Sequence, residues 1–135
     1  MIPIDNKHNI DDKIIQGHSW IEDIVYFNEP LMSLYKNEAD QKFLYIWCDR
    51  NDNSDRWVIF EIGQENLDSF LNQKITLLEL FNLPNQKIVF DINADDQKTN
   101  FKFLNNDDYP KEYLPSKKSY LYSEIMVKTI DSRGQ

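Results

Sequence analysis

The chain has 135 residues and a formal net charge of −8 at pH 7, and 41% of its residues are hydrophobic. This length favours a single domain, and the hydrophobic fraction is large enough for a packed core, so global disorder is not expected. The negative charge disfavours direct binding to nucleic acid, because the phosphate backbone is also negative. It would instead assist an encounter with a basic protein partner, although many proteins are acidic without such a role.

The single cysteine, Cys48, rules out a disulfide framework within the chain and is typical of proteins from a reducing compartment. The N-terminal residues lack the apolar segment of a secretion signal. No apolar run approaches the roughly 20 residues that a helix needs to span a bilayer. These features predict a cytoplasmic protein without a membrane segment.

The two ends of the chain are predicted to lie outside the folded domain. Residues 1–17 combine polar residues with scattered isoleucines and end at Gly17, which predicts a flexible arm with a short helical turn around residues 11–16. Residues 18–127 are predicted to form a single domain. The polar residues 128–135 are predicted to be a disordered tail.

Two strands are predicted before the centre of the chain. Residues 20–27, with the sequence WIEDIVYF, are rich in β-branched and aromatic side chains and predict the first strand. A turn signal at 28–30 separates it from a second strand at 30–36. The polar residues 37–41 then form a connection.

The most strongly patterned segment is 42–63, with the sequence KFLYIWCDRNDNSDRWVIFEIG. Two apolar runs, 43–48 and 57–60, flank a polar loop at 49–55. Neither run has the spacing of an amphipathic helix, so the segment predicts an antiparallel hairpin. Both faces of the hairpin are apolar, and we therefore expect other parts of the chain to cover them.

Two short helices are predicted directly after the hairpin. Residues 66–71 place leucine and phenylalanine on one helical face. In the next helix, 77–83, Thr76 and Glu79 match a capping box, and Pro84 follows the end. We expect these two helices to cover one face of the hairpin.

The chain then returns to strand. Residues 86–92 and 100–104 predict a further hairpin, a polar loop follows at 105–109, and 120–122 predict a last strand. The predicted fold class is α+β: an antiparallel β-meander sheet with a two-helix insertion packed on one face.

Metal binding is not predicted. The two histidines, His8 and His18, show no zinc-ligand spacing with each other or with the cysteine. Four oxygen-bearing residues of the hairpin loop do match positions 1, 3, 5 and 7 of a calcium loop: Asp49, Asn51, Asn53 and Asp55. However, Ser54 stands where that loop needs glycine and Phe60 where it needs glutamate. A solvated turn is the better interpretation.

Catalysis and cofactor binding are not predicted either. Cys48 lies in an apolar strand and is best explained as a small buried side chain. The chain has only three glycines and no glycine-rich phosphate-binding or dinucleotide motif. Its paired carboxylates fall in predicted loops, where solvent keeps them from the shifted pKa that acid–base chemistry needs.

One candidate partner surface remains, formed by Tyr45, Trp47 and Trp57. These aromatic residues lie on the predicted hairpin, on or near the face that the helices do not cover. If exposed, they would form an apolar patch of the kind that binds a protein partner or a second copy. The alternative is that the sheet curls, or that later strands fold back, and buries them.

The hairpin sequence, the following run NLDSFLNQKITLLELF and the segment around 114–116 together resemble a family of small bacterial proteins of unknown function. The resemblance covers residues 20–123. Its strongest positions are Trp47, Trp57, Phe60, Leu71, Ile75, Leu78 and Leu80. It implies a bacterial, cytoplasmic, stand-alone domain and provides no catalytic residue or substrate.

The leading functional hypothesis is a non-enzymatic protein-interaction module, such as an antitoxin, an immunity protein or an accessory subunit, with a protein partner or a homodimer. The first alternative is an acidic nucleic-acid mimic that inhibits a nucleic-acid-binding protein, which would require carboxylates arrayed on one face. The second is a small-ligand binder or an enzyme of unknown type, which would require a concave pocket with converging polar groups.

Overall fold

The structure is a computed structural model that describes residues 9–10, 12–27, 29–51, 54–109, 111, 114–115 and 117–121. Its strands are β1 (Asn9–Ile10), β2 (Ser19–Phe27), β3 (Glu29–Lys36), β4 (Lys42–Asn51), β5 (Ser54–Ile62), β6 (Gln86–Ile92) and β7 (Lys98–Asn105). Its helices are α1 (Gln64–Leu71) and α2 (Leu77–Asn82), with the 3₁₀ turns η1 (Asp12–Ile15) and η2 (Asn106–Asp108).

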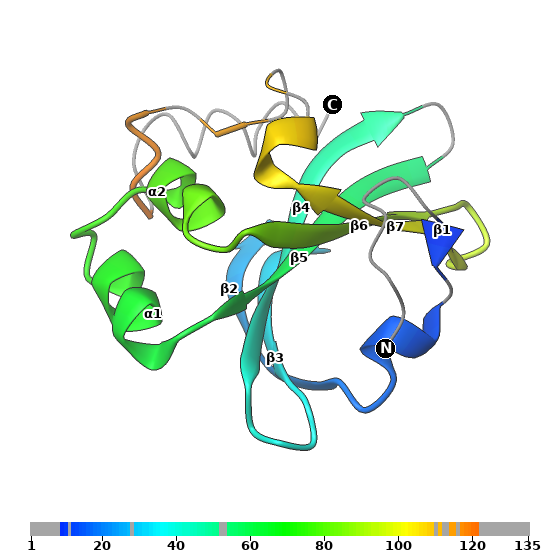
Figure 1. The fold of residues 1–135 in the computed structure, drawn as a ribbon, viewed down its shortest axis with the longest axis horizontal. Helices are drawn as coiled ribbons and strands as arrows, with labels where there is room; N and C mark the ends of the chain where they lie inside the picture. Colours follow the sequence, from blue (N-terminus) through cyan, green and yellow to red (C-terminus); the bar gives the residue numbers. More distant parts are fainter. Residues whose placement is uncertain are drawn as a thin grey trace.

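The strands form one antiparallel sheet in the spatial order β1-β7-β6-β5-β4-β3-β2 (Figure 1). From β2 to β7 each strand pairs with the next one along the chain. The connections are short except between β5 and β6, where α1 and α2 are inserted. The predicted antiparallel sheet and its two helices are confirmed. The predicted hairpin is also present, with strands that extend further into the polar loop than expected, to Asn51 on one side and from Ser54 on the other.

The strand β1 departs from this sequential order. It pairs with β7, with Asn9 opposite Lys102 and Ile10 opposite Phe101. Both β1 and η1 fall within the segment predicted as a flexible arm, and η1 lies where a short helical turn was expected. Residues 1–8 of that arm and the predicted tail at 128–135 lie outside the described residues.

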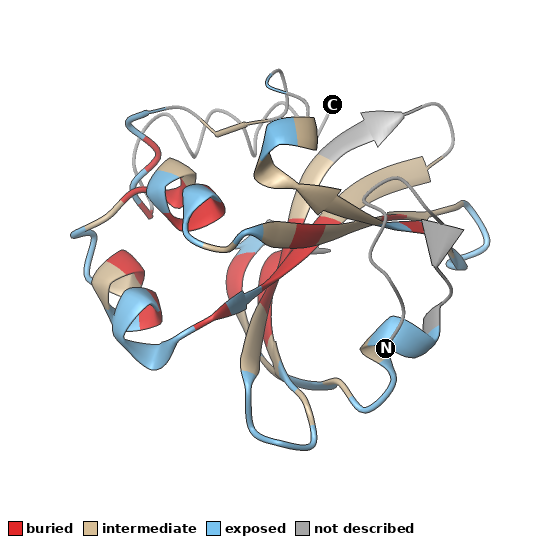
Figure 2. Cartoon of the chain, in the orientation of Figure 1, coloured by how far each residue is buried: buried red, intermediate tan, exposed pale blue. Residues whose placement is uncertain are grey.

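Side chains alternate between the two faces in the middle of the central hairpin, as the two-residue period of a strand requires. On one face, Leu44 lies opposite Phe60 and is fully buried; on the other, Tyr45 lies opposite Ile59. Figure 2 shows buried residues concentrated in the middle of the sheet and on the inner sides of the helices. Both faces of the hairpin therefore carry buried side chains, which belong to two different clusters.

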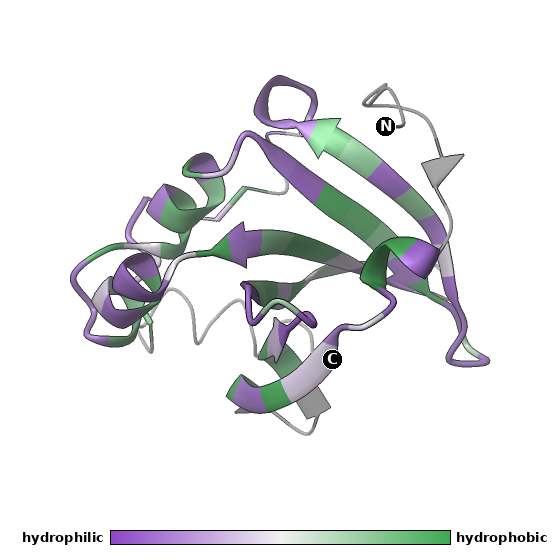
Figure 3. Cartoon of the chain, turned by 60° about the horizontal axis from the view of Figure 1, so that its bottom comes forward, coloured by the Kyte–Doolittle hydropathy of each residue, from purple (hydrophilic) through white to green (hydrophobic). Residues whose placement is uncertain are grey.

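The larger cluster of buried side chains includes residues of both helices. The rings of Phe60 on β5 and Phe81 on α2 meet edge to face, with centroids 5.5 Å apart. Leu67 and Phe70 of α1 belong to the same cluster, as does Leu121 near the end of the described chain. Figure 3 shows hydrophobic and hydrophilic residues mixed along each helix, as expected for amphipathic helices with one buried side.

A smaller cluster lies on the opposite face of the sheet. Its buried members are Tyr45, Ile59, Phe90 and Phe101. Ile15, at the end of η1, packs against it. Figure 1 accordingly shows η1 on the side of the sheet away from α1 and α2.

The start of α2 explains where one sequence prediction is wrong. The capping box forms as expected: the Thr76 hydroxyl accepts from the Glu79 amide, and the Glu79 carboxylate accepts from the Thr76 amide, both at 3.1 Å. Two further helix amides, those of Leu77 and Leu78, donate to the carbonyl and the hydroxyl of Ser119. Ser119 therefore caps a helix, and Tyr120 and Leu121 after it do not join the sheet.

The strand predicted at 120–122 is consequently not formed over its described part. Tyr120 and Leu121 lie outside any strand, and Leu121 is buried in the larger cluster. An apolar residue in an extended segment gives the same sequence pattern whether its backbone pairs with a strand or caps a helix. Residue 122 lies outside the described residues.

Two hairpins of the sheet have connecting loops of the same conformation. In residues 37–41 the Asn37 side-chain oxygen accepts from the amides two and four positions ahead, both at 3.0 Å. In residues 93–97 the Asn93 oxygen does the same, at 2.9 and 3.0 Å. The aspartates in the fourth position, Asp40 and Asp96, adopt φ values of 63° and 60°. Both loops share the pattern Asn-x-x-Asp-Gln, in which asparagine organises the turn and aspartate tolerates the left-handed conformation.

Candidate functional site

A cavity of about 310 Å³ opens on the face of the sheet that α1 and α2 do not cover. Its lining residues come from β2 to β7 and from the loop between the last two strands. Five of them are aromatic: Trp20, Tyr35, Tyr45, Trp57 and Phe90. Four are charged: Asp23, Asp55, Asp96 and Lys98.

The floor of the cavity is a set of touching rings. Tyr35 and Tyr45 stack with ring centroids 4.0 Å apart, and Tyr45 meets Phe90 edge to face at 6.3 Å. Tyr45 is only 5% exposed, and burial, followed by the neighbouring Tyr35, raises the pKa of its hydroxyl. Trp57 packs beside the same cluster. This floor is built because alternate residues of adjacent strands point to one face.

His18, just before β2, contacts the aromatic floor from one side. Its Nδ1 atom lies 2.7 Å from the Tyr45 hydroxyl oxygen, and its ring stacks on Phe43 with centroids 4.4 Å apart. Burial lowers the pKa of His18 below its ordinary value. The histidine therefore acts here as a neutral, packed ring that positions the tyrosine.

The carboxylate of Asp23 is held in place at the β2 side of the cavity. Its Oδ1 atom accepts from the indole nitrogen of Trp20 at 2.9 Å and from the Ser33 hydroxyl at 2.6 Å. Burial, and then the charge of Asp23, raise the pKa of the Tyr35 hydroxyl. The negative potential of this carboxylate thus reaches the aromatic floor.

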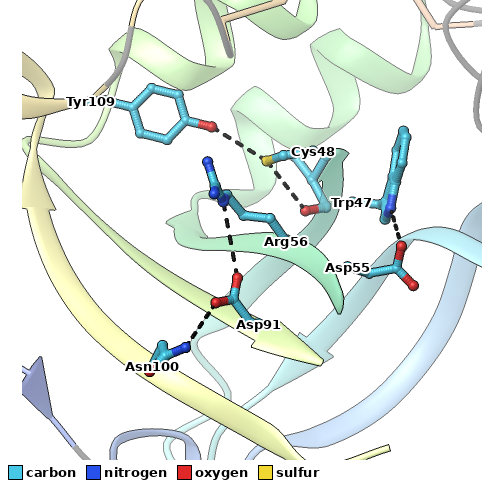
Figure 4. A network of polar contacts seen from close by, with 8 residues as sticks. Trp47, Cys48, Asp55, Arg56, Asp91, Asn100 and Tyr109 are labelled. Carbon is cyan, nitrogen blue, oxygen red and sulfur yellow. Dashed lines mark hydrogen bonds and ion pairs between the residues drawn. The ribbon is translucent and has the colours of Figure 1, made fainter. Parts of the chain in front are cut away.

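Asp55 supplies a second ordered carboxylate, from the start of β5. Its Oδ1 atom accepts from the Trp47 indole nitrogen at 3.1 Å, as Figure 4 shows. Asp96 lies in the left-handed position of the loop between β6 and β7, and Lys98 begins β7. Three aspartates and one lysine therefore surround the aromatic floor.

Figure 4 also shows polar contacts outside the cavity lining. Arg56 and Asp91 are directly opposite on β5 and β6, with 4.0 Å between Nε and Oδ1, and Asn100 donates to Asp91 at 3.0 Å. The Cys48 sulfur lies 3.3 Å from the Tyr109 hydroxyl oxygen. Cys48 is half-buried and packs against the larger cluster, which fits the structural role predicted for it.

Lys87 is the one lysine among the described residues whose side chain is buried, at 2% exposure. It lies with the larger cluster, on the face opposite the cavity: its Nζ atom donates to the Asn106 side-chain oxygen and sits 5.7 Å and 5.5 Å from the ring centroids of Phe81 and Tyr109. Burial lowers its pKa to about 8. Nothing in its sequence position, between Gln86 and Ile88, distinguished it.

The residues of the predicted partner surface are separated by the fold. Tyr45 is buried in the cavity floor, and Trp57 is half-buried in its wall. Trp47 is opposite Trp57 on the neighbouring strand but packs against the larger cluster and lies outside the cavity lining. The β4–β5 register shifts directly after Trp47, and such a bulge re-aims neighbouring side chains.

The more exposed aromatic residues lie on β2, the last strand of the described sheet. Trp20 is 58% exposed at the rim of the cavity, and Tyr26 is 64% exposed further along the strand. The sequence patterns did not single out Trp20, Asp23, Tyr35 or Lys98, and they placed Asp96 among the paired carboxylates of predicted loops, where acid–base chemistry was not expected. One signal in the sequence could have located the cavity floor. Each of four successive strands carries an aromatic residue that points to this face: Tyr35, Tyr45, Trp57 and Phe90.

Among the described residues, no group of three or more histidine, cysteine, aspartate or glutamate side chains is placed to hold a metal ion. Of the calcium-type positions, Asp55 is engaged with Trp47, and Asn53 lies outside the described residues. Within the same part of the chain, no helix is both long and apolar enough to cross a membrane. The cytoplasmic location stays a prediction.

A model of a family of unknown function (DUF6575) matches residues 13–131. The chain belongs to this family. The match confirms the predicted resemblance to a family of unknown function and covers nearly the same residues, whereas the bacterial origin stays a prediction. No curated protein and no solved structure shows significant similarity to this DUF6575 chain.

Proposed function

We propose that this chain is a non-enzymatic protein-interaction module that contacts its partner at the aromatic cavity and the adjoining edge of the sheet. The observation that carries the proposal is the cavity itself, in which five aromatic rings and three carboxylates converge beside the exposed Trp20. Aromatic residues are enriched in the energetically dominant parts of protein interfaces.

The position of β2 at the edge of the described sheet supports the same proposal. Edge strands are the strands to which a partner strand can add. Within the described part of the chain, β2 is the last strand of the sheet and pairs with β3. Trp20 and Tyr26 both lie on this strand and are largely exposed. A partner segment could therefore pair with β2 and place a side chain in the cavity beside it.

A small-ligand binder is the second candidate. It is favoured by the cavity volume of about 310 Å³, at the lower end of the range of roughly 300–1,000 Å³ that is typical of ligand pockets. A nucleic-acid mimic stays a hypothesis based on the net charge of −8 alone.

The test uses affinity capture with the full chain as bait, followed by purification of each captured protein. Binding of the purified partner is then measured by calorimetry to the wild type, to Trp20→Ala and to Leu83→Ala. Leu83 is 53% exposed near α2 and controls for the loss of an exposed apolar side chain. We expect Trp20→Ala to weaken binding at least about tenfold and Leu83→Ala to leave it unchanged.

The proposal is overturned if every purified partner binds Trp20→Ala as tightly as the wild type. It is also overturned if no captured protein binds the wild type once purified. In the latter case, a small molecule that co-purifies with the wild type and not with Trp20→Ala would favour the ligand-binding alternative.

A further inference from the structure

We infer that the cavity accepts the guanidinium group of an arginine side chain in a basic segment of the partner. The inference rests on the proposed function, because it names the chemistry of the partner at the same cavity. It is carried by the juxtaposition of the Tyr35, Tyr45 and Trp57 rings with the carboxylates of Asp23 and Asp55.

The charged residues that line the cavity determine whether the ligand is a cation or an anion. Even without Asp55, the lining holds the two carboxylates of Asp23 and Asp96 against the one lysine, Lys98, and the whole chain carries −8. An anionic group would be repelled by this field. A neutral apolar group would displace water from the carboxylates without replacing its hydrogen bonds, which is unfavourable.

The aromatic floor restricts the kind of cation. The electron-rich faces of tyrosine and tryptophan attract cations, and a planar guanidinium can also stack on them. Tyr35 is only partly buried although it stacks on Tyr45, so part of it remains accessible from the cavity. A metal cation gains little from such rings, whereas an organic cation uses both the rings and the carboxylates.

The carboxylates are placed to receive hydrogen bonds from such a group. Asp23 is oriented by Trp20 and Ser33, and Asp55 is oriented by Trp47. Guanidinium–carboxylate hydrogen bonds are charge-assisted and often bidentate, so preordered carboxylates favour arginine over lysine. The modest volume suits one side chain better than a larger molecule.

The test follows the indole N–H signals of the ¹⁵N-labelled full chain by NMR. The probes are N-acetyl-arginine amide, N-acetyl-lysine amide and N-acetyl-citrulline amide, a neutral molecule of nearly the same shape as the arginine probe. We expect the arginine probe to shift the Trp20 and Trp57 signals to saturation, the lysine probe to bind more weakly and the citrulline probe to produce no saturable shift. Equal shifts from the arginine and citrulline probes, or no saturable shift from any probe, overturn the inference.

A matched pair of variants tests the charge directly. Asp96→Asn removes a carboxylate from the cavity lining, and Asp40→Asn makes the same change in the equivalent loop away from it. Asparagine tolerates the positive φ of both positions. We expect the affinity for the arginine probe to fall at least about threefold in Asp96→Asn and to stay unchanged in Asp40→Asn. Equal affinities in the two variants contradict the inference.

The two proposals fail in different ways. If partner binding depends on Trp20 but the cavity does not distinguish arginine from citrulline, the proposed interaction function is supported and the arginine preference is wrong. If the cavity selects arginine but no purified partner needs Trp20 for binding, the cation preference is supported and the proposed protein-interaction function is wrong.

Discussion

The Nδ1 atom of His18 lies 2.7 Å from the hydroxyl oxygen of Tyr45, and this contact ties the residues before β2 to the aromatic floor of the cavity. Burial lowers the pKa of His18 from its ordinary value of 6.5. The folded state therefore disfavours the protonated ring, and stability is lost as the pH falls below 6.5 and through the lower folded pKa. The loss of stability is greatest once the pH is below both the unfolded and the folded pKa of His18.

We predict an NMR titration of the His18 ring with a midpoint below 6.5. In urea unfolding between about pH 7 and about pH 5, the wild type should lose more stability than His18→Gln, which has no imidazole to protonate. Carboxylates titrate equally in both proteins, so the difference isolates the histidine. A midpoint at or above the ordinary value would contradict the prediction.

Trp57 and Trp47 provide a matched pair across the central hairpin. The Trp57 indole nitrogen is buried without a hydrogen-bond partner among the described residues, whereas that of Trp47 donates to Asp55. A buried unpaired donor costs about 1–3 kcal/mol, and a typical hydrogen bond contributes about 1 kcal/mol. Trp57→Phe should therefore leave the free energy of unfolding unchanged or raise it slightly. Trp47→Phe should lower it by about 1 kcal/mol.

Thermal and urea unfolding of the two tryptophan variants provide the comparison. Equal losses of stability in both would mean that the loss of ring area outweighs the removal of the unpaired donor. That result would sink the prediction.

Lys87 makes stability depend on pH in the alkaline range. Its pKa is about 8 in the folded protein because of burial, against an ordinary value of 10.5. Between these values the unfolded state binds more protons than the folded state, so stability rises with pH. The raised pKa values of Tyr35 and Tyr45 act in the opposite direction only as the pH approaches 10 and above.

We predict that the free energy of unfolding rises by about 1.5 kcal/mol between about pH 8 and about pH 9.5. In Lys87→Met, which keeps a long apolar side chain beside Phe81, the rise should disappear. Urea unfolding at several pH values measures both slopes. An identical slope in wild type and variant would assign the effect to another group.

The capping box at the start of α2 should be measurable through Thr76. Thr76→Ala removes the hydroxyl that accepts from the Glu79 amide and should lower the free energy of unfolding by about 1 kcal/mol. Thr76→Ser keeps the hydroxyl and should lose less than Thr76→Ala. If Thr76→Ser and Thr76→Ala lower the free energy of unfolding equally, the hydrogen bond is not the source of the stabilisation.

Most elements of the fold follow from local patterns in the sequence. The hairpin and the strand at Gln86–Ile92 could be predicted because their apolar runs are short and rich in β-branched and aromatic residues, and α2 because Thr76 and Glu79 match a known cap. The connections at 37–41 and 93–97 were also predicted, and their shared Asn-x-x-Asp-Gln pattern would have indicated that the two turns have the same geometry. Patterns of this kind depend only on neighbouring residues.

The cavity could not be predicted in the same way. Asp23, Asp55 and Asp96 come from different parts of the chain, and what brings them around one set of rings is the register and curvature of the whole sheet. The two-residue strand β1 is too short to leave any periodic pattern. A bulge next to Trp47 separates its environment from that of Trp57, and a single sequence does not reveal a bulge.

The pairing of β1 with β7 has a consequence for how the protein is made. From β2 to β7, each strand can join the sheet as soon as it leaves the ribosome, because its partner has just been synthesised. The strand β1 is synthesised before all of these and must wait for β7, the last of the described strands. Among the described strands, the first to be made is therefore the last to pair, and β1 cannot cover the β7 edge until β7 has been made.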